Sequence, residues 1–291
     1  MSLQINVRDL PEHGISLMTA SDPSFEKRIS AVLKGKPDAL VDALKPFSVF
    51  LMNSSDKAIV AYNLNWKLMK ADGTIITRKS GGANSGALMY GGSPGFEHVS
   101  TITGHAIRPG SGRFVSLGFS LSEDDSTGIS AVITGSEDRG TLARLEKVTK
   151  EYTPSAIAKD ASAELRQYSN ITVVVDGIFF EDGSFIGPDE TDFFAYVKAG
   201  VDAKYALLRE VKTHLDDNRD LLDIFKGLEE LAKDQSATVN DASTSTDHYK
   251  YFRKVWATEL LNMRRALGDK RSITAAIQWL RKPWAVLTRK G

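Results

Sequence analysis

The chain has 291 residues, 42% hydrophobic and 25% charged, which is enough to bury one large core or two moderate ones. Its formal net charge is zero, so no whole-protein field directs it toward nucleic acid or a membrane. The absence of cysteine excludes disulfides, thiolate metal sites and a cysteine nucleophile. The N-terminus MSLQINVRDL lacks the pattern of a signal peptide, so we expect either a cytoplasmic protein or the mature form of an envelope or secreted protein.

Residues 1–46 are expected to form a lead-in that contains a short strand near Gly14–Thr19 and one helix. Phe25 and Ile29 belong to the apolar stripe of that helix. From Pro46 onward the apolar residues alternate along the chain, which predicts strands rather than helices. The predicted strands are Phe47–Met52, Ile59–Lys70, Thr74–Arg78, Val99–Thr103 and Arg113–Leu121.

Two segments interrupt the strands. Residues 79–98 are rich in glycine and predict a loop that connects two strands; the segment lacks the Lys-Ser/Thr ending of a P-loop. Residues 122–170 predict a polar and partly helical insertion, with helices around Gly140–Lys150 and Ser155–Tyr168. A last strand signal starts at Ile171, and we expect residues 47–187 to form one β-sandwich that contains this insertion.

Turn residues and apolar positions within 47–121 follow a recognisable order. They are Phe47-x-Val49-Phe50-x-x-Asn53-x-Ser55-Asp56-Lys57-x-Ile59, then Leu68 and Ala71-Asp72-Gly73, then Ile107-x-Pro109-Gly110-Ser111 and Phe114. This pattern resembles a bacterial Ig-like module of the FxLYD type, which is often found in envelope or secreted proteins. The resemblance implies a non-catalytic adhesive or scaffolding module with a protein partner, and it brings no functional residues with it.

After Gly187 the apolar spacing changes to three and four residues, which predicts helices over residues 188–291. The segment 234–247 has the composition of a flexible linker, Gly268 is expected to end the third helix, and Ser272 to cap the fourth. The sequence therefore predicts an α+β protein, in which an Ig-like antiparallel β-sandwich precedes a C-terminal helical bundle.

Charge is distributed unevenly between the predicted helices. Residues 248–291 hold 11 Lys and Arg against two acidic residues, a net charge of +9, whereas residues 176–247 have a net charge of −10. Basic amphipathic helices that carry tryptophan can bind an anionic membrane surface or nucleic acid. The near-cancellation of the two charges favours the alternative, in which the acidic and basic helices pack together.

No arrangement of residues in the sequence predicts catalysis, a cofactor or a metal site. The acidic residues Asp176, Glu181 and Asp182 suggest paired carboxylates, but Glu181-Asp182-Gly183 is first of all typical of a hairpin turn. We expect a binding or scaffolding protein with a protein partner and no cofactor. The alternatives are a protein that binds an anionic membrane or nucleic acid through its basic helices, and a hydrolase whose site is not recognisable. The candidate binding residues are Asn84, Ser85, Tyr90 and Phe96 in the glycine-rich loop, and Arg264, Arg265, Lys270, Arg271, Trp279, Arg281, Lys282 and Trp284 in the basic segment.

Overall fold

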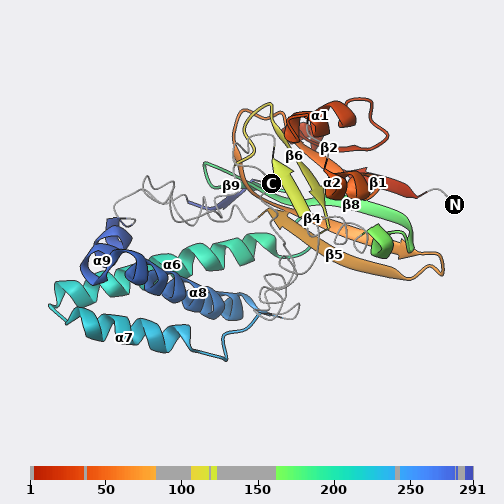
Figure 1. The fold of residues 1–291 in the computed structure, drawn as a ribbon. Coiled ribbons are helices and arrows are strands. Elements are labelled where there is room, and N and C mark those ends of the chain that lie inside the picture. Colours follow the sequence, from red (N-terminus) through yellow and green to blue (C-terminus); the bar gives the residue numbers. More distant parts are fainter. Residues whose placement is uncertain are drawn as a thin grey trace. The chain divides into compact units, whose positions relative to one another are not determined.

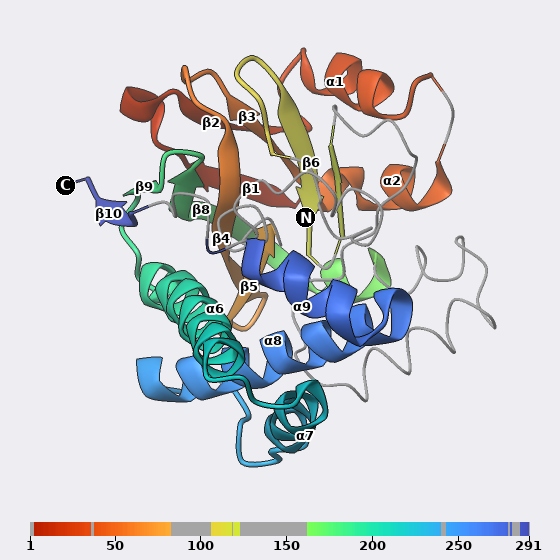
Figure 2. The same ribbon diagram turned by 90° about the vertical axis from the view of Figure 1, so that its left-hand side faces the viewer.

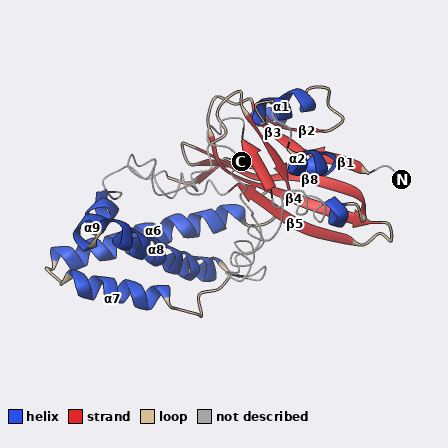
Figure 3. Ribbon diagram, in the orientation of Figure 1, coloured by secondary structure: helices blue, strands red, loops and turns tan. Residues whose placement is uncertain are grey.

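The computed structural model describes residues 3–35, 38–82, 106–117, 119–122, 162–239, 243–278, 280 and 286–290. The chain divides into two compact units. The β-rich unit comprises Met1–Asn84, Ser100–Thr191 and Thr288–Gly291, and the helical unit comprises Ser85–Val99 and Asp192–Leu287. Figures 1 and 3 show the strands in the first of these and the helices α6 to α9 in the second.

The β-rich unit contains two sheets. The six-stranded sheet has the order β10-β9-β8-β4-β5, and β1 pairs in parallel with the first half of β8. Its strands are β1 (Gln4–Arg8), β4 (Ile59–Lys70), β5 (Ile75–Gly82), β8 (Tyr168–Phe180), β9 (Ser184–Ile186) and β10 (Thr288–Arg289). The four-stranded sheet is antiparallel, with the order β2-β3-β6-β7. Its strands are β2 (Ile15–Thr19), β3 (Val49–Asn53), β6 (Gly112–Ser116) and β7 (Phe119–Ser122).

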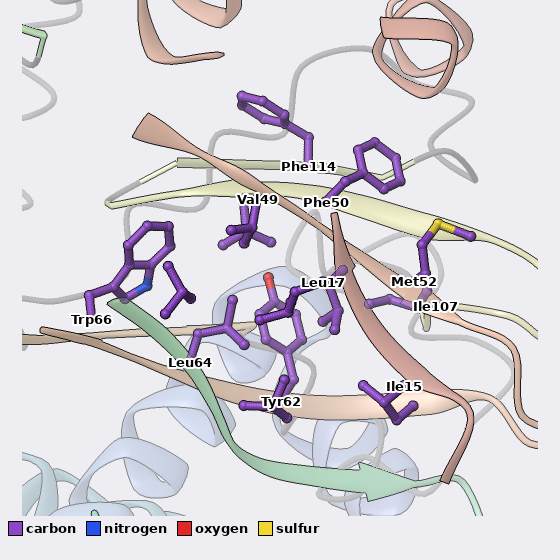
Figure 4. Packing of buried hydrophobic residues seen from close by; sticks show 14 of the residues in the cluster. Ile15, Leu17, Val49, Phe50, Met52, Tyr62, Leu64, Trp66, Ile107 and Phe114 are labelled. Carbon is purple, nitrogen blue, oxygen red and sulfur yellow. The ribbon is translucent and has the colours of Figure 1, made fainter. Parts of the chain in front are cut away.

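The core of this unit lies on both faces of the four-stranded sheet. Strand β3 is buried along its whole length, as its unbroken apolar run Val-Phe-Leu-Met predicts. On one face Phe50 and Phe114 contact Phe25 of α1 (Phe25–Val32), with ring centroids 6.5 and 6.4 Å apart. Tyr62, Leu64 and Trp66 of β4 lie on the opposite side (Figure 4). Figure 2 shows α1 beside β6 and the second short helix, α2 (Ala39–Leu44), next to it.

Asn53 organises one corner of the β-rich unit. Its side chain is fully buried; Nδ2 donates to the carbonyls of Lys57 and Ile107, at 2.8 and 2.7 Å, and Oδ1 accepts from the amide of Ser55. The amide of Gly110 donates to the carbonyl of Asn53 at 2.7 Å. The turn residues that carry the Ig-like pattern, 53–57 and 107–110, are therefore joined by hydrogen bonds although they are far apart in sequence.

The α+β prediction is confirmed, with two mostly antiparallel sheets followed by packed helices. Strand β4 has the predicted bounds, but the predicted strand Arg113–Leu121 is two strands joined by a turn at Leu117. The expected lead-in contributes β1 to one sheet and β2 to the other, so it is part of the same compact unit. Two pairings, β1 with β8 and β10 with β9, are parallel, so the expected sandwich is not purely antiparallel. The predicted strand Val99–Thr103, the helix at Gly140–Lys150 and most of the loop 79–98 lie outside the described residues.

The helical unit is built around one central helix, α8. This helix packs against α6, α7 and α9, and Phe252, Trp256 and Leu260 are among its buried side chains. The four helices are α6 (Phe193–Asp216), α7 (Leu221–Ala232), α8 (Ser245–Leu267) and α9 (Asp269–Gln278). The predicted C-terminal bundle is thus confirmed, and Gly268 ends α8 as expected, with a positive φ of 79°. The predicted cap at Ser272 is wrong, because α9 already begins at Asp269 and Ser272 is buried within its first turn.

Candidate functional site

The outer face of the six-stranded sheet has a hollow near the turn that joins β4 to β5. This face turns away from the core: Lys67 of β4 stands opposite Thr172 of β8 and Thr77 of β5, and Met69 opposite Asn170 and Ile75. The hollow has a volume of about 220 Å³. Ligand pockets usually measure roughly 300–1,000 Å³, so this one is sized for a side chain rather than for a large cofactor. Its lining residues are Arg8, Lys67, Met69, Ile75, Asn170, Thr172 and Val174.

The hollow has an apolar part and a polar part. Met69, Ile75 and Val174 supply the apolar surface, and Ile75 is 61% exposed, unusually high for so large an apolar side chain in this protein. Asn170 and Thr172 offer amide and hydroxyl groups, and Asn170 accepts a hydrogen bond from Asn6 at 3.2 Å. An apolar surface beside a few fixed polar groups is the usual composition of a binding site.

Two cations stand at the hollow. Lys67 forms an exposed ion pair with Glu190 at 3.4 Å, which contributes only about 0–1 kcal/mol and leaves the ammonium accessible. Arg8 lies at the exposed end of β1, opposite Val174, and forms no ion pair with another of the described residues. The site therefore favours a ligand that carries a negative charge next to an apolar group.

Asp176, the first of the suggested catalytic carboxylates, is a structural anchor. It is 0% exposed, and its Oδ1 accepts from the amide of Glu190 at 2.7 Å. Its Oδ2 accepts from the hydroxyl of Thr191 at 2.5 Å and from Nδ2 of Asn63 at 3.1 Å. These bonds hold the segment that leads from β9 to α6, so the carboxylate has no free face for a substrate.

The other two acidic residues form the turn between β8 and β9. Gly183 has a φ of +80°, and its amide donates to the carbonyl of Phe180, as expected for a tight turn. Partial burial opposes ionisation of Asp182, but the Lys57 ammonium and hydrogen bonds from Ser184 outweigh it and hold the pKa of Asp182 well below its usual value. Glu181 accepts from the amide of Ala58 at 3.2 Å. All three suggested acids therefore have structural roles, because they form hydrogen bonds or ion pairs within the fold.

The segment Asp189–Asp192 directly precedes α6, and acids at this position are typical of a helix N-cap. Asp192 stands at the N-cap position, but its φ is +57° and its side chain makes no capping hydrogen bond. Asp189 instead forms an ion pair with Arg289 of β10, and Thr191 is bound to Asp176. Asp189 and Glu190 therefore pair with Arg289 of β10 and Lys67 of β4 rather than with the first turn of α6.

A lysine is buried inside the helical unit. Lys204 of α6 is 1% exposed, and its Nζ lies 4.9 Å from the ring centroid of Trp256, whose Nε1 donates to the carbonyl of Gly200 at 3.2 Å. Burial lowers the pKa of Lys204 well below its usual value. In the unfolded chain the same amine stays protonated up to its ordinary pKa, so unfolding takes up a proton over the interval between the two values.

Replacing Lys204 with methionine is expected to raise the melting temperature at pH 7, because a side chain of similar length then fills the site without the free-energy cost of burying an ionisable amine. Stability of the wild-type protein rises with pH between the lowered pKa and the ordinary value, so the advantage of Lys204→Met should shrink as the pH approaches about 10.4. Thermal unfolding at several pH values measures this. Lys198→Met, an exposed position on the same helix, is the control and should show no such trend. A constant difference between Lys204→Met and wild type at all pH values would contradict the assignment.

The structure separates the candidate residues of the basic segment. Arg264 is held by Asp269 and Glu229, whereas Arg265, Lys270 and Arg271 are exposed. Eight candidates lie outside the described residues: Asn84, Ser85, Tyr90, Phe96, Trp279, Arg281, Lys282 and Trp284.

The hollow on the six-stranded sheet was not predicted from the sequence. The alternation of Asn63, Asn65, Lys67 and Met69 along β4 was a signal for a polar outer face, but the partners on β1 and β8 come from pairings that the sequence does not reveal.

Within the described parts of the chain, no three histidine or acidic side chains gather closely enough to bind a metal ion. No described helix is both long and apolar enough to cross a bilayer. Comparison of the chain with protein-family models, curated proteins and solved structures finds no match.

Proposed function

We propose that the β-rich unit is a non-enzymatic binding module with an Ig-like sandwich, which takes up a segment of a partner protein on the outer face of its six-stranded sheet. The observation that carries the proposal is the hollow of about 220 Å³, in which the exposed Ile75 and Met69 lie beside Arg8 and Lys67. The inner face of the same sheet is occupied by core residues, whereas Lys67, Met69 and Ile75, near the turn between β4 and β5, lie outside that core and are at least partly exposed.

The Asn53 corner supports the Ig-like part of the proposal. In the sequence pattern, the stretch around Asn53 and the turn around Gly110 are separate signals. In the structure they share one hydrogen-bond network that fixes the ends of β3 and β6. Such a corner positions loops at one end of a sandwich.

The chemistry of the hollow indicates what the partner segment presents. The space admits one aliphatic or aromatic side chain, which would cover Met69, Ile75 and Val174. A carboxylate next to that side chain would reach the ammonium of Lys67 or the guanidinium of Arg8, and a charge-assisted hydrogen bond of this kind is stronger than a neutral one. The partner is therefore a protein segment in which an apolar residue adjoins Asp or Glu.

Selection from a library of displayed random peptides tests this proposal. Peptides enriched on the wild-type protein are expected to place an apolar residue beside an acidic one. Their affinity for Ile75→Glu should fall at least about tenfold, because the change removes apolar contact and adds a like charge. Leu222→Glu is a matched control, since Leu222 in α7 has the same 61% exposure. It should leave binding unchanged.

Two results would contradict the proposal. One is enrichment of peptides that bind Ile75→Glu as well as they bind the wild type. The other is a set of peptides rich in Lys and Arg, which the cations at the hollow would repel. Binding by titration calorimetry on the purified variants distinguishes these outcomes from the expected one.

A further inference from the structure

The corner between α8 and α9 exposes an apolar side chain among cations. We define the basic corner as Arg265, Leu267, Lys270 and Arg271. Leu267 is 41% exposed at the end of α8, where Gly268 turns the chain with a φ of 79°. Arg265, Lys270 and Arg271 are all exposed and lie within four residues of Leu267.

Arg264 does not belong to this surface, although the sequence places it beside Arg265. Its Nε donates to Asp269 at 2.8 Å and its Nη1 to Glu229 at 3.3 Å, while the guanidinium carbon lies 4.2 Å from the ring centroid of Phe225. Arg264 thus pairs with Glu229 of α7 and with Asp269 of α9. The three cations of the basic corner form no ion pair with another described residue; Arg265 donates only to the amide oxygen of Asn262, at 3.3 Å.

Lys270 and Arg271 do not help to stabilise α9, so helix stability does not explain why cations occupy these two positions. Both lie in the first turn of this helix, which begins at Asp269. The helix dipole places partial positive charge there, so cations in the first turn oppose helix formation. Arg265 is different, because it stands in the last turn of α8, where a cation is favourable. Two of the three cations thus occupy positions that folding alone disfavours.

We propose that the basic corner binds the surface of a bilayer that contains anionic lipids. The cations contact lipid headgroups, and Leu267 enters the boundary between headgroups and acyl chains. Leu267 favours a lipid partner over nucleic acid. Transfer of an exposed leucine from water to the acyl chains lowers the free energy, whereas contact with a phosphate backbone does not. This surface belongs to the helical unit and does not depend on the function proposed for the sheet.

Vesicle co-sedimentation of the full chain tests the proposal. The probes are phosphatidylcholine vesicles with and without about one third phosphatidylglycerol, each at low and high NaCl. The wild-type protein should sediment with the anionic vesicles only, and less at high salt. Changing Arg265, Lys270 and Arg271 together to serine should lower the partition coefficient about a hundredfold, from roughly a factor of five for each cation. Leu267→Ser should lower it severalfold without changing the salt dependence.

The matched control changes Arg108, Arg219 and Lys226 to serine. Like the corner variant, this control loses two arginines and one lysine, and all three residues are exposed. It should sediment like the wild type. Equal loss in the control and the corner variant would show that net charge alone drives binding, which overturns the proposal. Absence of wild-type sedimentation, or duplex DNA binding that depends on the corner while vesicle binding does not, overturns it as well. Circular dichroism of each variant confirms that a loss of binding is not a loss of folding.

Discussion

Replacing Asp176 with alanine is expected to lower the free energy of unfolding of the β-rich unit by about 3 kcal/mol or more. The carboxylate is fully buried and accepts hydrogen bonds from three groups: the amide of Glu190, the hydroxyl of Thr191 and the side-chain amide of Asn63. Each donor left buried without an acceptor costs roughly 1–3 kcal/mol, and more where the lost acceptor is charged. Urea unfolding followed by tryptophan fluorescence measures the loss, since Trp66 lies in the core of this unit.

Glu181→Gln provides the control for Asp176→Ala. The glutamine retains a side-chain oxygen that can accept from the amide of Ala58, so its effect should stay within about 0.5 kcal/mol. Unchanged stability of Asp176→Ala would contradict the role of Asp176 as an anchor and would reopen the question of a chemical role for its carboxylate.

Replacing Gly187 with alanine is the second change with a large expected effect, a loss of about 3 kcal/mol. Gly187 has a φ of +120°, and a Cβ atom there would lie 2.5 Å from the carbonyl oxygen of Asp176 and 3.0 Å from the Cα of Gly177. Both contacts are with backbone, which cannot move aside as a flexible side chain can. The loss therefore combines backbone strain with a clash inside β8. Urea unfolding again gives the free energy.

Gly73→Ala separates these two contributions. Gly73 also has a positive φ, +86°, but no heavy atom of a described residue beyond its two chain neighbours lies within 4 Å of the position of its Cβ. Alanine there should cost only the conformational strain, about 1 kcal/mol. If the two variants lose the same free energy, the close approach of Gly187 to β8 contributes nothing and the expected packing of this junction is wrong.

The sequence predicted those helices and strands whose apolar periodicity is visible within the element itself. Alternation along Ile59–Lys70 gave β4 its bounds, because one face of that strand is buried over its whole length. Three- and four-residue spacing likewise gave the buried stripes of α6 and α8. Strand β1 was missed, and its partner, Asn170 to Val174, lies far along the chain, where no local pattern connects the two.

The candidate site was predictable only in part, for the same reason. The sequence correctly favoured structural roles for the acids around Glu181, since an Asp-Gly pair between two apolar runs is a local signal. The hydrogen bonds from Asn63 to Asp176 and to Thr191 join residues 113 and 128 positions apart and have no local signal. The hollow likewise depends on the register between β1, β8 and β4, which sequence periodicity does not fix.

The pairing of β10 with β9 links the stability of the two units. Arg289 reaches Asp189 across one hundred residues of sequence, and nearly all of that intervening chain belongs to the helical unit. While α6 to α9 are folded, most of the residues between these two groups are held in helices. When the helices melt, the whole segment becomes a flexible loop whose closure carries a larger entropic penalty. The occupancy of the short strand β10 should therefore fall when the helices melt, before the sheet itself unfolds. Amide exchange at Thr288 and Lys290, whose amides donate to Gly183 and Phe185, would report events in α6 to α9.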